Sequence, residues 1–149
     1  LLGSVVVLAC RVHALLLLLM PVMSRKRIVV TGMSGLIGGI MRRELESDYE
    51  LVAVNRREVA GVECHQADVA NFEAIRAAFD GADCVLHLAA LAEMDAGIDA
   101  IVSNNIVGTY NVFEAACEAG VSRIVFASSG AAIGNYELDA PYSQLQTIG

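Results

Sequence analysis

The stretch IVVTGMSGLIGG, Ile28–Gly39, places glycines at 32, 35 and 38 directly after a short apolar run. Glycine inside a helix costs about 1 kcal/mol relative to alanine, so packing through helix side chains does not explain the three residues. A β-branched run that passes through glycines into helical spacing indicates a strand, a tight turn and a helix start. The free N–H groups of a helix start favour an anion.

Each glycine has its own expected purpose in such a turn. Gly32 permits the tight turn, Gly35 lets the backbone approach a pyrophosphate, and Gly38 lets the helix pack closely against the sheet. The spacing G-x-x-G-x-x-G has one residue more in its first gap than the usual dinucleotide fingerprint. The stretch therefore predicts dinucleotide binding, with a glycine-rich turn that serves packing alone as the alternative.

The chain from residue 25 to about residue 129 alternates apolar strands with helical patterns. We expect strands at 27–31, 49–55, 62–68, 83–90 and 123–129, and helices at 36–48, 71–82 and 101–120. Asn71 is a candidate N-cap, and Gly81 and Gly120 are expected just past helix ends. Alternation predicts right-handed crossovers, and nearly continuous apolar strands predict helices on both faces. The expected fold class is α/β, with a doubly wound parallel sheet.

The two ends of the chain read differently from this region. Residues 1–23 are almost entirely apolar but carry Arg11 in the middle, which adds about 3 kcal/mol or more to the cost of bilayer insertion. Met23 opens MSRKRIVVTG, a normal start for a domain, so we expect residues 1–23 to be a hydrophobic extension outside the fold. A membrane anchor or signal is the alternative. Residues 24–134 form the expected domain, and 135–149 an irregular tail.

Composition narrows the partners. The chain is 56% hydrophobic and 18% charged, with a net charge of −7 and a pI of about 4.8, so it can bury a core and does not offer a basic nucleic-acid surface. A bound anion must be held by local groups such as backbone N–H donors. The cysteines, Cys10, Cys64, Cys84 and Cys117, have no metal-ligand spacing and predict buried free thiols in a reducing, cytoplasmic setting.

Five segments, taken in order, resemble the extended branch of the short-chain dehydrogenase/reductase superfamily, the NAD-dependent epimerases and dehydratases. The segments are TGMSGLIGG (31–39), ADV (67–69), DCVLHLAA (83–90), NNIVGTYNVFEAA (104–116) and RIVFASSGAAIG (123–134). The resemblance covers about Lys26–Gly134. It implies a Rossmann-type fold, NAD or NADP as cofactor, and a small-molecule substrate such as a nucleotide sugar.

The resemblance also assigns cofactor-binding positions. They are Leu36 and Ile37 beside the pyrophosphate, Asp68 and Val69 beside the adenine, Leu88, Ala89 and Ala90 along the cofactor, and Asn104 or Asn105 near it. A helix cap is the alternative for Asp68, and helix-to-sheet hydrogen bonding is the alternative for the asparagines. His87 is expected to be a packed strand histidine.

The end of the second expected strand should choose between NAD and NADP. An acidic residue there binds the ribose 2′-hydroxyl, but this chain has Asn55 followed by Arg56 and Arg57. Asparagine can bond a hydroxyl, and Arg56 could pair with a 2′-phosphate. Two solvated arginines are the alternative, so the cofactor choice stays open at this point.

Ser129 matches the family's catalytic Ser or Thr and would hydrogen-bond a substrate oxygen; a serine capping a turn is the alternative. The resemblance also implies a tyrosine base in Y-x-x-x-K, yet no tyrosine of this chain has lysine four residues on, and Lys26 is the sole lysine. We therefore expect the pair and a substrate lobe to follow Gly149.

The expected protein is thus the NAD(P)-binding portion of an epimerase/dehydratase-type oxidoreductase. It would act by hydride transfer on a sugar nucleotide or a related hydroxy or keto compound, with little turnover from this portion alone. The complete enzyme could pair as a homodimer. The alternatives are a non-catalytic dinucleotide-binding redox sensor or regulatory module, and a membrane-tethered reductase that rests on residues 1–23 alone.

Overall fold

The computed structural model of the chain describes residues 25–93 and 95–129. Its strands are β1 (Arg27–Thr31), β2 (Glu50–Asn55), β3 (Glu63–Gln66), β4 (Cys84–His87) and β5 (Arg123–Phe126). Its helices are α2 (Leu36–Leu45), α3 (Phe72–Ile75) with the 3-10 turn η1 (Arg76–Phe79), α4 (Ile98–Ile101), the π-helical η2 (Val102–Val107) and α5 (Gly108–Glu118). The expectations for residues 1–23, for 130–134 and for the tail 135–149 lie outside the described residues.

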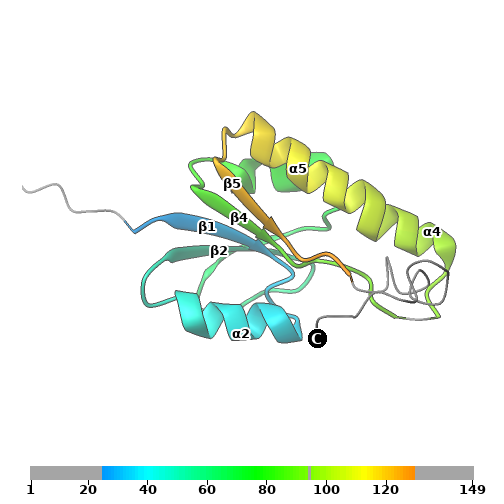
Figure 1. The fold of residues 1–149 in the computed structure, drawn as a ribbon, viewed down its shortest axis with the longest axis horizontal. Helices are drawn as coiled ribbons and strands as arrows, with labels where there is room; N and C mark the ends of the chain where they lie inside the picture. The colour runs from blue at the N-terminus through cyan, green and yellow to red at the C-terminus, as the bar shows by residue number, and fades with distance from the viewer. Residues whose placement is uncertain (1–24, 94, 130–149) are drawn as a thin grey trace, which may run out of the picture.

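The five strands form one parallel sheet in the order β3-β2-β1-β4-β5. Helix α2 covers one face, and α5 covers the other (Figure 1). Alternate residues of β1 divide between the two faces: Ile28 and Val30 belong to the core cluster against which Met41 of α2 packs, and Val29 belongs to the cluster that contains Val112 of α5. The predicted α/β class and doubly wound parallel sheet are confirmed.

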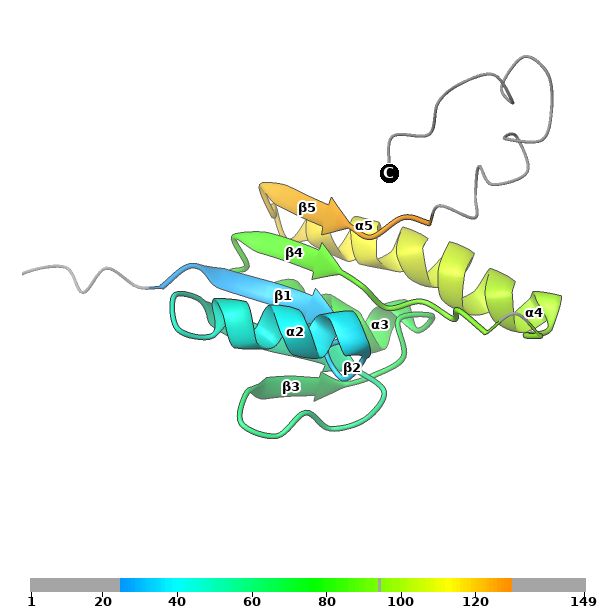
Figure 2. The same ribbon diagram turned by 60° about the horizontal axis from the view of Figure 1, so that its bottom comes forward.

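The strand order places a switch point between β1 and β4. The chain moves outward from β1 through β2 to β3, and then returns to the other side of β1 to add β4 and β5. Figure 2 shows β1 and β4 side by side, with their carboxyl ends at the edge of the sheet where α2 begins. In open parallel sheets the crevice at such a point is where ligands bind.

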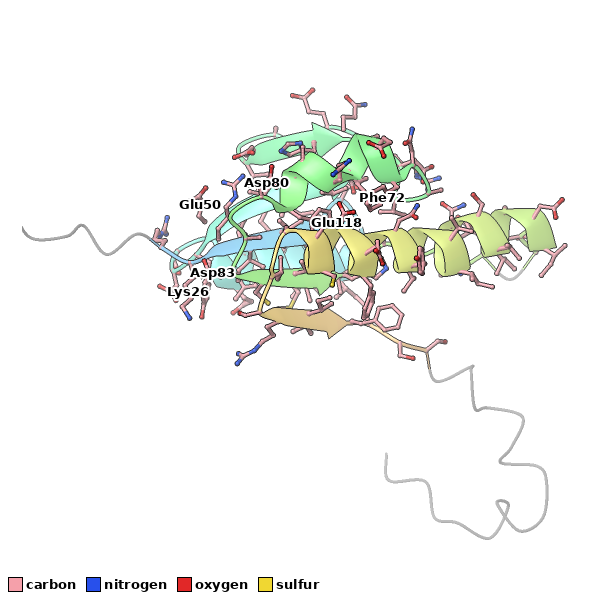
Figure 3. All side chains as sticks on the ribbon, turned by 90° about the horizontal axis from the view of Figure 1, so that it is seen from above. Lys26, Glu50, Phe72, Asp80, Asp83 and Glu118 are labelled. Atoms are coloured by element: carbon pink, nitrogen blue, oxygen red, sulfur yellow. The ribbon has the colours of Figure 1, made fainter. Side chains whose placement is uncertain are left out.

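Charged side chains gather at the opposite, amino-terminal end of the strands, where Figure 3 labels Lys26, Glu50 and Asp83. The guanidinium of Arg27 pairs with Glu50 and lies 2.8 Å from Glu63, and the Arg27 N–H donates to Asp83. The hydrogen bond from Arg27 lowers the pKa of Glu63. These charges pair across β1, β2 and β3 and link the amino-terminal ends of the three strands.

The boundaries differ from the predicted ones in places. The helix expected at 71–82 is a single α-helical turn followed by a 3-10 turn, and the helix expected at 101–120 begins at Ile98 and contains a π-helical segment. Asn71 caps α3 as predicted, because its side chain accepts from the Ala74 N–H at 3.3 Å. Gly81 and Gly120, both at φ +70°, follow helix ends as predicted.

One burial prediction is wrong. Cys117 is exposed, because it lies on the side of α5 that faces away from the sheet, next to the buried Ala115 and Ala116. Cys64 and Cys84 are partly buried free thiols. Within residues 25–93 and 95–129, none of the helices has the length and apolar character needed to span a bilayer.

Candidate functional site

A groove of about 320 Å³ lies at the carboxyl ends of β1, β2 and β4, at the switch point. It is lined by the glycine turn (residues 32–35), by the end of β2, by the segments that follow β2, β3 and β4, and by one residue of η2. Its residues are Gly32, Ser34, Gly35, Val54, Asn55, Arg56, Arg57, Ala67, Asp68, Val69, Leu88, Ala89, Ala90, Glu93 and Asn104. Most of the cofactor-binding residues predicted from the sequence therefore meet in one place.

The glycine turn has no room for side chains at two positions. Gly32 has φ +73°, and a Cβ there would lie 2.8 Å from the backbone nitrogen of Ala89, so only glycine lets the turn lie against the segment after β4. A Cβ on Gly38 would lie 2.6 Å from Cα of Met33 and would overlap the Gly32 carbonyl oxygen. The close approach predicted for Gly38 is present, but its partner is the turn after β1 and not the sheet itself.

The start of α2 suits an anion. Gly35 is the N-cap, no side chain caps the helix, and the first turn contains no acidic residue. The N–H groups of the first turn have no partner within a helix, and the positive end of the helix dipole lies beside them. Leu36 and Ile37 are 84% and 58% exposed and are not among the residues that line the groove, so their contact with a pyrophosphate stays a prediction.

Asn55 joins the end of β2 to the glycine turn. Its side chain is buried, and its amide nitrogen donates to the hydroxyl of Ser34 at 3.0 Å and to the carbonyl of Arg57 at 2.6 Å. Its amide oxygen accepts from the Ser34 hydroxyl at 3.2 Å. Both the oxygen and the nitrogen of the Asn55 amide are therefore engaged by neighbouring residues. Arg56 and Arg57 have exposed side chains and line the groove.

The turn after β3 brings Asp68 and Val69 to the groove. One oxygen of Asp68 accepts from the Ala70 N–H at 2.9 Å, which makes it a turn residue. The alternative of a helix cap for Asp68 is wrong, because Asn71 caps α3. The buried Asn111 of α5 donates to the Val69 carbonyl at 3.0 Å and thereby fixes this turn.

The segment after β4 is held by Thr31 at the end of β1. The Thr31 hydroxyl accepts from the N–H groups of Leu88 at 3.2 Å and Ala89 at 3.1 Å. His87 is fully buried beside it, which confirms the packed strand histidine, and burial lowers its pKa to about 4. Leu88, Ala89 and Ala90 form one wall of the groove.

The two asparagines of η2 separate in space. Asn104 lines the groove, and its amide nitrogen donates to the Ala100 carbonyl at 2.9 Å. Asn105 instead clamps the backbone of Leu91, accepting from its N–H at 2.7 Å and donating to its carbonyl at 2.9 Å. Of the two candidates, Asn104 is the one beside the groove. Ser129 follows β5 with an exposed side chain and is not part of the groove lining.

Several lining residues were not singled out from the sequence as cofactor-binding: Ser34, Val54, Arg57, Ala67 and Glu93. Ser34 could have been predicted from the sequence, because a serine hydroxyl inside a glycine turn of the phosphate-binding type needs a hydrogen-bond partner nearby. The sequence pattern points to Arg56 as the partner of a 2′-phosphate, and Arg57 is only its neighbour in that pattern. Glu93 carried no signal, because it lies in an irregular segment after β4.

Comparison with known proteins tests the predicted family. Residues 28–147 match the NAD dependent epimerase/dehydratase family. L-arabinose 1-dehydrogenase (NAD(P)(+)) of Haloferax volcanii is 43% identical over 103 residues, which are 69% of this chain and 41% of that protein. Uronate dehydrogenase of Agrobacterium fabrum is 38% identical over 116 residues, which are 74% of this chain and 43% of that protein.

The solved structures agree. A uronate dehydrogenase mutant from Agrobacterium tumefaciens, complexed with NAD, is 38% identical with a TM-score of 0.64, over 70% of this chain and 41% of that one. WbmG of Bordetella bronchiseptica, in complex with NAD, is 25% identical with a TM-score of 0.68, over 78% of this chain and 41% of that one. The predicted cofactor class is confirmed for the family.

The chain spans about two fifths of the length of the curated relatives that it matches. The matched part contains the glycine turn, the sheet and the groove at its switch point. This chain therefore belongs to the NAD dependent epimerase/dehydratase family, the family that its glycine turn and four later segments resemble.

Proposed function

We propose that this chain holds the nicotinamide dinucleotide of an oxidoreductase that acts on the hydroxyl or keto group of a sugar or sugar acid. The observation that carries the proposal is the groove at the switch point, where the glycine turn meets the segments after β2, β3 and β4. The free N–H groups at the start of α2 supply the anion site, and the missing side chains of Gly32 and Gly38 let the turn after β1 lie against the segment after β4 and against α2.

Each wall of the groove has a part of the cofactor to hold. The start of α2 would bind the pyrophosphate, the turn with Asp68 and Val69 would flank the adenine, and Asn55 with Arg56 would lie beside the adenine ribose. Leu88, Ala89, Ala90 and Asn104 would line the nicotinamide half. The order of these segments along the groove supports this assignment, because the glycine turn lies between the segments after β2 and β4.

The chemistry follows from what such a cofactor supplies. A bound nicotinamide would supply the acceptor for the hydride of the carbon that bears the hydroxyl, and the hydroxyl proton would pass to a base as the carbonyl forms. Ser129 would hydrogen-bond the reacting oxygen and so orient it. The tyrosine–lysine pair that the resemblance implies as the base is not among these 149 residues.

The names of the relatives favour a sugar or sugar acid over a nucleotide sugar as the substrate. The similar curated proteins include dehydrogenases of L-arabinose, uronate and glucose 6-phosphate. A nucleotide sugar is the second candidate, because the similar MoeE5 structure, 30% identical with a TM-score of 0.64 over 69% of this chain and 36% of that one, contains UDP-glucuronic acid and NAD.

Two measurements test the proposal. The first is a titration of the chain with NADH and NADPH, followed by nicotinamide fluorescence, which no tryptophan of this chain disturbs because it has none. The second is a turnover assay of a protein that contains this chain together with a tyrosine–lysine pair, with L-arabinose, glucuronate, glucose 6-phosphate and UDP-glucuronic acid as substrates. Ser129→Ala should lower kcat about 100-fold or more and leave the Kd of the dinucleotide unchanged.

The outcomes separate the function classes. Binding with turnover of one of these substrates supports the oxidoreductase. Binding without turnover in the longer protein would favour the non-catalytic redox sensor or regulatory module. If the folded chain bound neither dinucleotide, the whole proposal would fail.

A further inference from the structure

The end of β2 has no carboxylate to meet the 2′-position of an adenine ribose. Asn55 occupies the place where an acidic residue would bind the 2′-hydroxyl of NAD. Its amide is committed to Ser34 and to the Arg57 carbonyl, and its side chain is buried. The end of β2 therefore offers neither the hydrogen-bond acceptor that selects NAD nor the negative charge that repels a phosphate.

Arg56 and Arg57 directly follow Asn55, and side chains of β2 and β3 hydrogen-bond their backbone carbonyls. Asn55 donates to the Arg57 carbonyl at 2.6 Å, and Gln66 of β3 donates to the Arg56 carbonyl at 3.1 Å. These two bonds hold the turn in place, so the positions from which the two side chains leave the backbone are set before any ligand arrives. Both residues line the groove, and both are exposed.

Neither guanidinium is neutralised. Across residues 25–93 and 95–129, the ion pairs of arginine involve Arg27, Arg42 and Arg76, and no carboxylate lies within 4 Å of the guanidinium of Arg56 or Arg57. Arg56 and Arg57 are thus two adjacent positive charges without an ion-pair partner among the described residues. They form the positive part of a groove whose other charged lining residues are acidic.

One of the two acidic lining residues is near this end of β2, because β3 is paired with β2 and the Ala67 N–H, next to Asp68, donates to the Asn55 carbonyl at 3.1 Å. Asp68 follows β3, and one of its oxygens is held by the Ala70 N–H, while Glu93 lies in the segment after β4, on the other side of the glycine turn. Arg56 and Arg57 directly follow β2 and line the groove, so a phosphate bound at the end of β2 would lie beside both. Guanidinium groups bind phosphate through paired, charge-assisted hydrogen bonds, and their planar shape suits this geometry.

We propose that the groove binds NADP(H) in preference to NAD(H), with Arg56 and Arg57 pairing with the 2′-phosphate. This inference rests on the proposed function, because it needs the dinucleotide to lie along the groove with its adenine ribose at the end of β2. It narrows the cofactor choice that the sequence left open.

The test is calorimetric titration of the chain with NADP⁺ and NAD⁺ at low and at high salt. We expect NADP⁺ to bind about tenfold more tightly or better, and the advantage to shrink as salt screens the exposed charges. The double variant Arg56→Ala with Arg57→Ala should lose the advantage, because its affinity for NADP⁺ should fall about tenfold or more further than its affinity for NAD⁺. Both side chains are exposed, so circular dichroism should report an unchanged fold.

The control is Arg43→Ala, which removes one positive charge, half of what the double variant loses, from an exposed arginine on α2 that does not line the groove. It should leave the preference for NADP⁺ intact. Tighter binding of NAD⁺ than of NADP⁺ by the unaltered chain would overturn the inference and leave the proposed function standing. A preference for NADP⁺ that survives in the double variant would overturn the assignment to Arg56 and Arg57, and failure of both nucleotides to bind would overturn inference and function together.

Discussion

The hydroxyl of Thr31 lies 2.6 Å from Nδ1 of His87, and this contact sets the protonation state of a fully buried imidazole. The hydroxyl oxygen already accepts from the N–H groups of Leu88 and Ala89, so its own hydrogen points to His87. Nδ1 is therefore the acceptor, and Nε2 carries the proton and donates to the hydroxyl of Thr109 at 3.1 Å. One chain of hydrogen bonds thus joins β1, β4 and α5 behind the groove.

The first prediction concerns the pH dependence of stability. Burial lowers the pKa of His87 from 6.5 to about 4, so the unfolded chain takes up a proton in this window before the folded chain does. His87 therefore contributes stability that is fully present above about pH 6.5 and is lost as the pH falls toward 4, at about 1.4 kcal/mol per pH unit. Urea unfolding between pH 7.5 and 5 measures this slope.

The matched variants are His87→Gln, which should flatten that slope, and His65→Gln on the edge strand β3, which removes an imidazole that is not fully buried. A long-range ¹H–¹⁵N spectrum should show the Nε2–H tautomer of His87 between pH 7.5 and 5.5. A protonated ring at pH 6 would contradict both the hydrogen-bond chain and the slope.

The second prediction removes the hydroxyl at the head of this chain. Thr31→Val keeps the shape of the side chain but leaves the Ala89 N–H and Nδ1 of His87 without their partner, while the Leu88 N–H keeps only its bond to the Thr31 backbone carbonyl at 3.2 Å. We expect a loss of about 1–3 kcal/mol in the free energy of unfolding, and weaker dinucleotide binding because Leu88 and Ala89 form a wall of the groove. Thr31→Ser keeps the hydroxyl and should restore most of both quantities. If Thr31→Val bound the dinucleotide as tightly as the unaltered chain, the hydroxyl would have no part in shaping the groove.

The sequence predicted the features that depend on local pattern. Apolar runs predicted β1, β2, β4 and β5, the less apolar segment 62–68 predicted β3, and the glycine spacing predicted where the groove would form. It could not predict contacts made between distant segments, such as the engagement of Asn55 by Ser34, 21 residues away, or the clamp of Asn105 on Leu91. It also could not predict that Cys117 is exposed, because the buried face of α5 is narrow and its next neighbours, Ala115 and Ala116, are buried.

The third prediction compares two adjacent glycines of α2. A Cβ on Gly38 would lie 2.6 Å from Cα of Met33, a backbone atom that cannot move aside cheaply, whereas a Cβ on Gly39 would meet nothing within 4 Å. Gly38→Ala should therefore destabilise the fold by about 1–3 kcal/mol and weaken dinucleotide binding, because α2 would have to move away from the glycine turn. Gly39→Ala should stabilise the helix by up to about 1 kcal/mol and leave binding unchanged. Equal effects of the two substitutions in thermal unfolding would show that α2 does not depend on close approach at Gly38.

The fourth prediction separates the two asparagines of η2 by what each one holds. Asn105 satisfies both backbone groups of Leu91, so Asn105→Ala should lower the free energy of unfolding by about 1–3 kcal/mol. Asn104 lines the groove and bonds within its own helix to the Ala100 carbonyl, so Asn104→Ala should weaken dinucleotide binding with a smaller change in stability.

Urea unfolding and NADH titration of both variants measure this division. Its physical basis is that a backbone N–H and carbonyl left without partners cost more than a side chain lost from the edge of a groove, which water can replace. The reverse pattern, in which Asn105→Ala alone weakens binding while Asn104→Ala alone destabilises the fold, would place Asn105 beside the cofactor and require the segment after β4 to rearrange when the dinucleotide binds.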